Sequence, residues 1–207
     1  MTTRQKLRQI VDGYARMFPK GWTRIRSMIA RRDGPWIQFI AFGSAAGGQM
    51  YGLSCGCDFL WEPDVCGSSY LGFSIGSENM RYDPDIPVKR FREISRSCVP
   101  FVDQPLKAAE IERKLRNLIS FYPSLFGWGD VKAHYPLCVV ATVKGDRKTA
   151  KKHFELYKRA FLNPQFDWTI TRVKELQHCL DLMTCHEELK KYLKGVEDEK
   201  LKGYKGL

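Results

Sequence analysis

The sequence predicts an α+β fold with an N-terminal helix, a four-stranded antiparallel meander, and then several helices with one further apolar strand. Apolar residues recur at helical spacing from Leu7 to Phe18, before Pro19-Lys20-Gly21 ends the pattern. Large and small residues alternate from Tyr51 to Trp61, which is the period of a strand. Asp33-Gly34, between two apolar segments, is the strongest short signal for a β-hairpin in the chain. A helix followed by consecutive hairpins accounts for these three observations.

The strands of the meander are expected at residues 22–31, 36–42, 51–61 and 70–76. The segment Trp36–Phe42 is apolar on both faces, so it is expected at the centre of the sheet.

The second half of the chain is predicted to be mainly helical. Helical spacing or helix-starting residues are found in four segments, at about 88–98, 103–122, 146–161 and from 171 to about 193. The apolar run Leu137–Val143 fits a buried strand or a short core helix, and its branched residues and short length favour the strand. We expect one domain over residues 1–195 and a charged, loosely held tail over 196–207.

The composition predicts a cytoplasmic protein. No apolar run approaches the roughly 20 residues of a membrane span, and the first residues lack the apolar core of a secretory signal. The seven cysteines are an odd number without a regular framework, and several lie in apolar segments. Such cysteines are typical of free thiols in a reducing compartment.

The chain is strongly basic, with a net charge of +11 and a pI near 9.4. Arginine dominates the first hundred residues and lysine the remainder. This charge suits a polyanion or an acidic protein surface as partner, although no block of like charge forms a separate basic arm.

Two sets of thiols and imidazoles resemble metal ligands, but their spacing argues against a site. Cys55 and Cys57 on one strand would be about 6.6 Å apart, so both could reach one zinc ion with Cys66 only if the strand bent. In His178-Cys179 and Cys185-His186, each ring lies seven residues from the other pair's cysteine, about 10.5 Å along a helix. We interpret these residues as ordinary core and helix positions and assign no metal site.

No catalytic motif stands out. Gly72-Phe73-Ser74-Ile75-Gly76 has the letters of a nucleophile elbow, but it lies within a strand pattern and no helix follows. The chain has no phosphate-binding loop and no dinucleotide fingerprint. Two acidic clusters are interpreted mainly as turn formers: Asp58, Glu62 and Asp64, and then Asp83 and Asp85. We therefore assign no catalytic residue and no cofactor, and we do not favour an enzyme.

A basic segment at residues 144–153 is the best candidate for nucleic-acid binding. Arg147, Lys148, Lys151 and Lys152 could neutralise phosphates. The alternative is a solvated outer helix face, partly balanced by Glu155, and the sequence favours that alternative.

Part of the sequence resembles small bacterial domains of unknown function in which a first helix precedes a meander and capping helices. The order of the first helix, Gly21-Trp22-Thr23-Arg24, the segment Asp33–Ile40 and a Gly- and Cys-rich strand carries the resemblance over residues 1–76. Some of these domains are immunity proteins of polymorphic toxins. The resemblance implies no particular functional residue, and the positive charge departs from immunity proteins that mask nucleases, which tend to be acidic.

From these observations we expect a non-enzymatic protein-binding module, with an immunity protein that occludes a toxin's active site as the specific hypothesis. Arginine and aromatic residues are enriched at protein interfaces. The candidate contact residues are Arg24, Arg26, Trp61, Arg90 and Arg92. A basic RNA- or DNA-binding protein is the alternative.

Overall fold

The computed structural model describes residues 3–16, 18–45, 50–63, 70–75, 106–121, 129–162 and 166–204. It divides into two compact units, where the sequence analysis expects one domain. Unit 1 comprises Met1–Asp58, Gly67–Ala108 and Gly203–Leu207, and unit 2 comprises Phe59–Cys66 and Ala109–Lys202.

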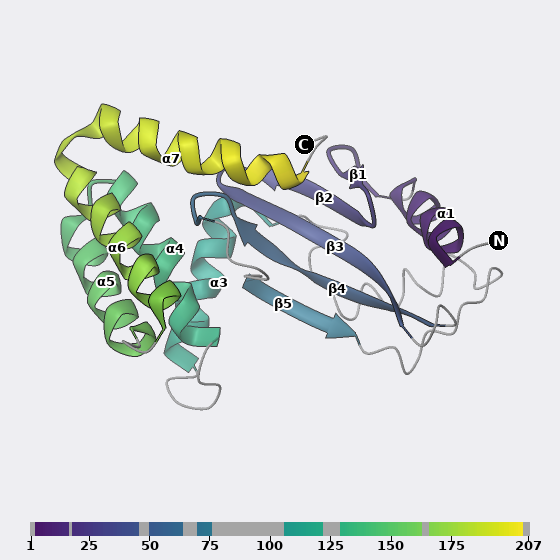
Figure 1. Ribbon diagram of the computed structural model, residues 1–207, viewed down its shortest axis with the longest axis horizontal. Coiled ribbons are helices and arrows are strands. Elements are labelled where there is room, and N and C mark those ends of the chain that lie inside the picture. The colour runs from purple at the N-terminus through teal and green to yellow at the C-terminus, as the bar shows by residue number, and fades with distance from the viewer. Residues whose placement is uncertain are drawn as a thin grey trace. The chain divides into compact units, whose positions relative to one another are not determined.

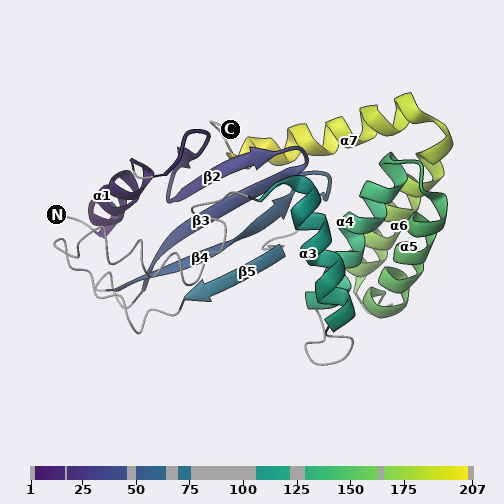
Figure 2. The same ribbon diagram turned by 180° about the vertical axis from the view of Figure 1, so that it is seen from behind.

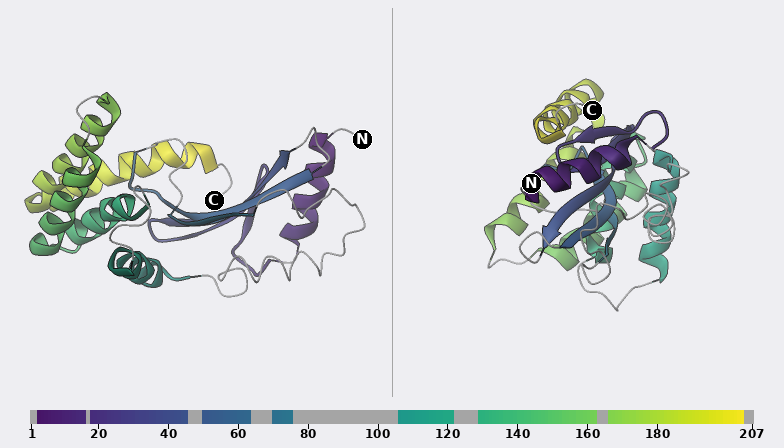
Figure 3. Two further views of the ribbon diagram at one scale, coloured as in Figure 1. Left: turned by 90° about the horizontal axis from the view of Figure 1, so that it is seen from below. Right: turned by 90° about the vertical axis from the view of Figure 1, so that its right-hand side faces the viewer.

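Unit 1 contains a helix and an antiparallel meander, which confirms the predicted fold class (Figures 1 and 3). The strands of the described residues are hydrogen-bonded in chain order, β1-β2-β3-β4-β5. The elements are α1 (Thr3–Ala15), β1 (Thr23–Ile25), β2 (Met28–Asp33), β3 (Trp36–Ala45), β4 (Met50–Phe59) and β5 (Tyr70–Ile75).

The meander has one more strand than predicted, because residues 22–31 form a hairpin instead of one strand. Ile25 pairs with Met28, so Arg26 and Ser27 make a two-residue turn between β1 and β2. The predicted Asp33-Gly34 turn is confirmed, since Asp33 pairs with Trp36. Gly34 has a φ of 58°, which is the left-handed conformation that a primed hairpin turn requires.

The core of unit 1 lies around β3, as its two apolar faces predict. Trp36, Ile37 and Ile40 are fully buried, and Tyr14 of α1 stacks on Phe42 with ring centroids 5.3 Å apart. Burial of these apolar side chains is the main source of stability here.

A buried glutamine on β3 holds the segment that leads into the second half of the chain. The Gln38 side chain donates to the Leu106 carbonyl at 2.5 Å and accepts from the Leu106 N–H at 3.0 Å. Asp33 Oδ2 accepts from the Ala108 N–H at 2.9 Å. These contacts satisfy backbone groups as a neighbouring strand would.

Strands β4 and β5 pair with an irregularity at the two cysteines of β4. Cys55 pairs with Phe73, but Cys57 pairs with Tyr70, so β5 has one additional residue between these pairs. The regular alternation expected through both cysteines is therefore interrupted in the pairing, as in a β-bulge.

Unit 2 is helical, and α4, α5 and α6 lie side by side in it (Figures 1 and 2). None of the helices in the described ranges is long and apolar enough to span a membrane. The elements are α3 (Ala108–Phe121), α4 (Gly129–Val143), α5 (Arg147–Phe161), α6 (Asp167–Asp181), η3 (Leu182–Thr184), α7 (His186–Leu201) and η4 (Lys202–Tyr204).

The predicted strand at Leu137–Val143 is wrong: this segment is the second half of α4. Residues 137–142 are all less than 5% exposed, so the helix is buried on every side. An all-round buried helix has the same continuous apolar sequence as a buried strand, and periodicity cannot separate them. Packing against α5 and α6 outweighs the strand preference of the branched residues.

The C-terminal region also differs from the prediction. The helix expected to continue from Thr171 to about residue 193 is interrupted by η3, and α7 begins at His186. Residues 196–201 are the last turns of α7 and not a loosely held tail, since Glu197 and Lys200 are 6% and 4% exposed.

Candidate binding surfaces

Unit 1 contains a groove of about 440 Å³ that is lined mainly by arginines. Amphipathic helix α1 packs Val11 and Tyr14 inward and leaves Arg4 and Arg8 on its exposed side. The β1–β2 hairpin supplies the other wall. The lining residues are Arg4, Leu7, Arg8, Arg24, Arg26 and Ser27.

Two of these arginines, Arg24 and Arg26, were predicted as partner contacts. Arg24 Nε lies 2.8 Å from Asp12 Oδ1, which is an ion pair by distance. The contact is an ion pair without a hydrogen bond, because the buried Nε–H of Arg24 makes no hydrogen bond with the described residues. Four guanidinium groups of the described residues line the groove, one of them paired with a carboxylate, and the groove favours anionic ligands.

Arg26 has an unusual backbone conformation. Its φ of 52° makes it the one non-glycine residue with positive φ in the described part of the chain. Arg26 is the first of the two turn residues in the hairpin. In a type II′ turn the residue at this position has a positive φ and is normally glycine. A strained residue at a groove is a reason to look for function there.

The other predicted contacts are Trp61, Arg90 and Arg92. Trp61 belongs to unit 2, where its indole N–H donates to Glu197 Oε2 at 3.2 Å and its ring contacts Phe59. Arg90 and Arg92 lie outside the described residues. The sequence could not indicate Arg4 and Arg8 as members of the set, because the fold brings α1 and the hairpin together.

The second surface is the outer face of α5. Arg147, Lys148, Lys151 and Lys152 are all exposed, as the nucleic-acid hypothesis requires. Asp146 caps the helix by accepting from the Thr149 N–H at 3.0 Å, as the sequence predicts. Lys158 and Arg159 extend the exposed cations into the last turn, and Glu155 is the acidic residue among them.

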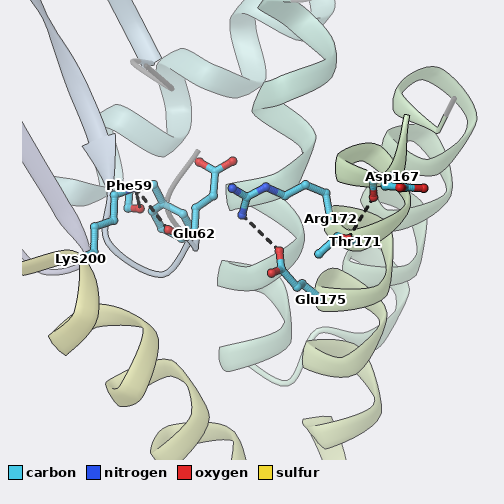
Figure 4. Close-up of polar contacts among 7 residues, drawn as sticks. All are labelled: Phe59, Glu62, Asp167, Thr171, Arg172, Glu175 and Lys200. Carbon is cyan, nitrogen blue, oxygen red and sulfur yellow. Dashed lines mark hydrogen bonds and ion pairs between the residues drawn. The ribbon is translucent and has the colours of Figure 1, made fainter. Parts of the chain in front are cut away.

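Arg172 in the interior of unit 2 has a structural role. Figure 4 shows its guanidinium between the side chains of Glu62 and Glu175, with an Arg172–Glu175 distance of 3.2 Å. Arg172 and Glu62 are each 5% exposed. Burial raises the pKa of Tyr135 and Tyr157, and Glu62 adds to both shifts. This cluster joins the segment after β4 to the helices of unit 2.

Lys200 makes a second internal contact with the same segment. Its Nζ donates to the carbonyls of Phe59 and Glu62 at 2.9 and 3.3 Å (Figure 4). Glu62 and Asp58, two acids considered at the sequence level, are thus both buried, and Asp58 accepts from the Tyr204 hydroxyl at 2.5 Å. The remaining acids of those clusters, Asp64, Asp83 and Asp85, lie outside the described residues.

The described thiols and imidazoles do not form a metal centre. No group of three His, Cys, Asp or Glu side chains gathers in the described part of the chain. Cys57 is buried, whereas Cys66 lies outside the described residues. Burial raises the pKa of Cys138 and of Cys179 to about 12, so both thiols stay protonated and unreactive.

Two histidines of unit 2 form a buried pair. Nδ1 of His134 and Nδ1 of His153 are 2.9 Å apart, and each residue is 8% exposed. Burial lowers the pKa of both rings, that of His153 to about 4, and Lys152 adds to both shifts. One neutral ring donates and the other accepts, so a positive charge is disfavoured here.

Comparison with protein-family models, with curated proteins and with solved structures finds no match to this chain.

Proposed function

We propose that the chain is a non-enzymatic protein-binding module that receives an acidic protein surface in the arginine groove of unit 1. The observation that carries this proposal is the gathering of Arg4, Arg8, Arg24 and Arg26 around one groove. Planar guanidinium groups bind carboxylates in a bidentate manner, and arginine is enriched at the energetically important centres of protein interfaces.

The toxin of a polymorphic toxin system is the partner that the resemblance of residues 1–76 suggests. In that role the chain would cover the toxin's active site and so neutralise it. A basic immunity protein requires a toxin with an acidic surface at the contact, and the arginine groove is suited to such a surface.

The experiment uses the full chain, purified by a tag from its native host or co-expressed with the products of neighbouring genes. Wild type is compared with Arg8→Glu/Arg26→Glu. Lys174→Glu/Lys190→Glu, which reverses two exposed charges in unit 2, is the matched control. We expect a stoichiometric partner with wild type and control, and a loss of at least tenfold in affinity with the groove variant.

A partner that binds the groove variant as tightly as wild type would contradict the proposed site. If no stoichiometric partner is found under several conditions, the proposal of a protein-binding module fails. The specific immunity hypothesis is tested by growth: co-expression of the chain should protect cells from the neighbouring toxin, and the groove variant should not.

Nucleic-acid binding by α5 is a second candidate function. It is favoured by one observation, the exposure of all four cations of Arg147, Lys148, Lys151 and Lys152 on a single helix. Each phosphate that these cations neutralise releases a counterion, so affinity should fall steeply with salt. An affinity for duplex and single-stranded DNA that does not change with salt, or no binding at low salt, would remove this candidate.

A further inference from the structure

Three large apolar side chains are exposed where α5 ends and α6 begins. In the described part of the chain, the large hydrophobic residues with substantial exposure are Leu162, Phe166 and Trp168, at 36%, 47% and 47%. The rings of Phe166 and Trp168 have centroids 6.3 Å apart and are tilted by 35°. Phe166 and Trp168 are therefore both about half exposed and lie next to each other where α6 begins.

Leu162 continues the cationic face of α5. Residues 148, 152, 155, 159 and 162 follow one another at spacings of three and four, which places them on one side of the helix. The opposite side, with Ala150, Phe154 and Tyr157, is buried in the core of unit 2. A chain that contacts the lysines of α5 along its length thus reaches Leu162 at the C-terminal end, and the two rings follow four and six residues later, at the start of α6.

We propose that this surface binds single-stranded nucleic acid in preference to duplex, with phosphates on the cations of α5 and bases stacked on Phe166 and Trp168. The proposal rests on the second candidate function and adds the form of the ligand. A single strand offers free base faces for stacking, whereas a duplex hides them between neighbouring pairs. The 15 residues of α5 span about 22 Å, enough for several nucleotides.

The type of cation supports nucleic acid over an acidic protein as the occupant. Four of the six exposed cations, Lys148, Lys151, Lys152 and Lys158, are lysines, and Lys158 Nζ is 5.9 Å from the centroid of the Phe154 ring. Lysine is depleted at protein interfaces, but it serves as a mobile point charge for phosphates. Exposed aromatic residues among such cations are the usual arrangement for sequence-tolerant binding of single strands.

The test measures the affinity of the full chain for a labelled 12-nucleotide oligothymidylate and for a 12-base-pair duplex by fluorescence anisotropy at several salt concentrations. Wild type should bind the single strand at least fivefold more tightly. Trp168→Ala should weaken single-strand binding by about tenfold and leave duplex binding unchanged, while Trp168→Phe should retain most of the affinity.

Charge variants separate the two parts of the proposal. Lys151→Gln/Lys152→Gln should weaken both ligands and reduce the salt slope by about one to two units, and the control Lys174→Gln/Lys190→Gln should change neither. Circular dichroism melts confirm that each variant is folded.

The outcomes distinguish the two proposals. Equal or tighter duplex binding, or a Trp168→Ala variant with unchanged single-strand affinity, would overturn the single-strand inference and leave α5 as a phosphate-binding surface. No binding to either oligonucleotide at low salt would overturn both. Binding that is weakened equally by the α5 and control variants would show that only overall charge matters and would also overturn both.

Discussion

The two units differ in where their positive charge lies and in which residues supply it. Unit 1 has 16 Lys and Arg residues against 8 Asp and Glu, a net +8, and eleven of its basic residues are arginines. Unit 2 has 18 against 15, a net +3, and thirteen of its basic residues are lysines. When the same sequence is divided at residue 100 instead, the two halves have almost equal net positive charges. The compact units therefore reveal a segregation that chain position hides.

The environment of the arginines differs as well. In unit 1, Arg4, Arg8 and Arg26 are exposed around a groove, where they are available to a ligand. In unit 2, Arg172 is buried between carboxylates, and the exposed cations of α5 are mostly lysines. The comparison suggests that the groove arginines of unit 1 serve recognition and that the buried Arg172 of unit 2 serves folding, and each half of this statement can be tested.

The largest expected effect is the loss of the buried arginine of unit 2. Arg172→Met keeps most of the side-chain volume but removes the cation that pairs with Glu175 and lies beside Glu62. Removing one partner of a buried ion pair typically costs about 3 kcal/mol or more. We expect the free energy of unfolding, measured by urea denaturation, to fall by about that amount.

The matched control is Arg8→Met in unit 1, which removes an exposed guanidinium at no structural cost. Its free energy of unfolding should stay within about 0.5 kcal/mol of wild type. If Arg8→Met and Arg172→Met destabilise equally, the division between recognition and folding arginines is wrong.

A second test compares the units through the pH dependence of stability. All four histidines lie in unit 2, so histidine titration affects that unit. Burial lowers the pKa of His134 and His153 in the folded state, to about 4 for His153, while the unfolded rings titrate near 6.5. The unfolded state therefore binds more protons between pH 6.5 and 4. Stability is complete above about pH 6.5 and falls as the pH drops through this window, by something on the order of 2 kcal/mol.

The measurement is urea denaturation at pH 7 and pH 5. His153→Gln should reduce the loss of stability between these pH values, and His186→Gln, at an exposed histidine at the start of α7, is the matched control. Hydrogen exchange should place the loss in α4 and α5. An equal loss in wild type and His153→Gln would contradict the role of the pair.

The sequence predicted those elements whose signals are local. The strand at β4, the hairpin at Asp33-Gly34 and the Asp146 cap each depend on residues close in sequence, and each is confirmed. Segment 137–143 failed because a helix buried on every side loses the periodicity that marks a helix. The Arg26-Ser27 turn was missed because it contains no glycine or asparagine.

The candidate surfaces were predictable only in part. The cations of α5 lie close together in sequence, so their common exposure could be anticipated. The arginine groove joins α1 to residues about 20 positions later, and Phe166 and Trp168 look like core residues in a sequence. Only tertiary packing decides which aromatic side chains remain at the surface.

The smallest expected effect concerns the backbone of Arg26 in unit 1. A non-glycine residue in the left-handed region costs roughly 1–2 kcal/mol, and glycine gives back part of this through its greater freedom in the unfolded chain. Arg26→Gly should therefore raise the free energy of unfolding by up to about 1 kcal/mol. Arg26→Ala, which loses the same charge but keeps the strain, should not stabilise the protein.

Both variants should weaken binding of an acidic partner equally. If glycine stabilises without any loss of binding, the strain is unrelated to recognition, and unit 1 loses one of its four proposed contacts.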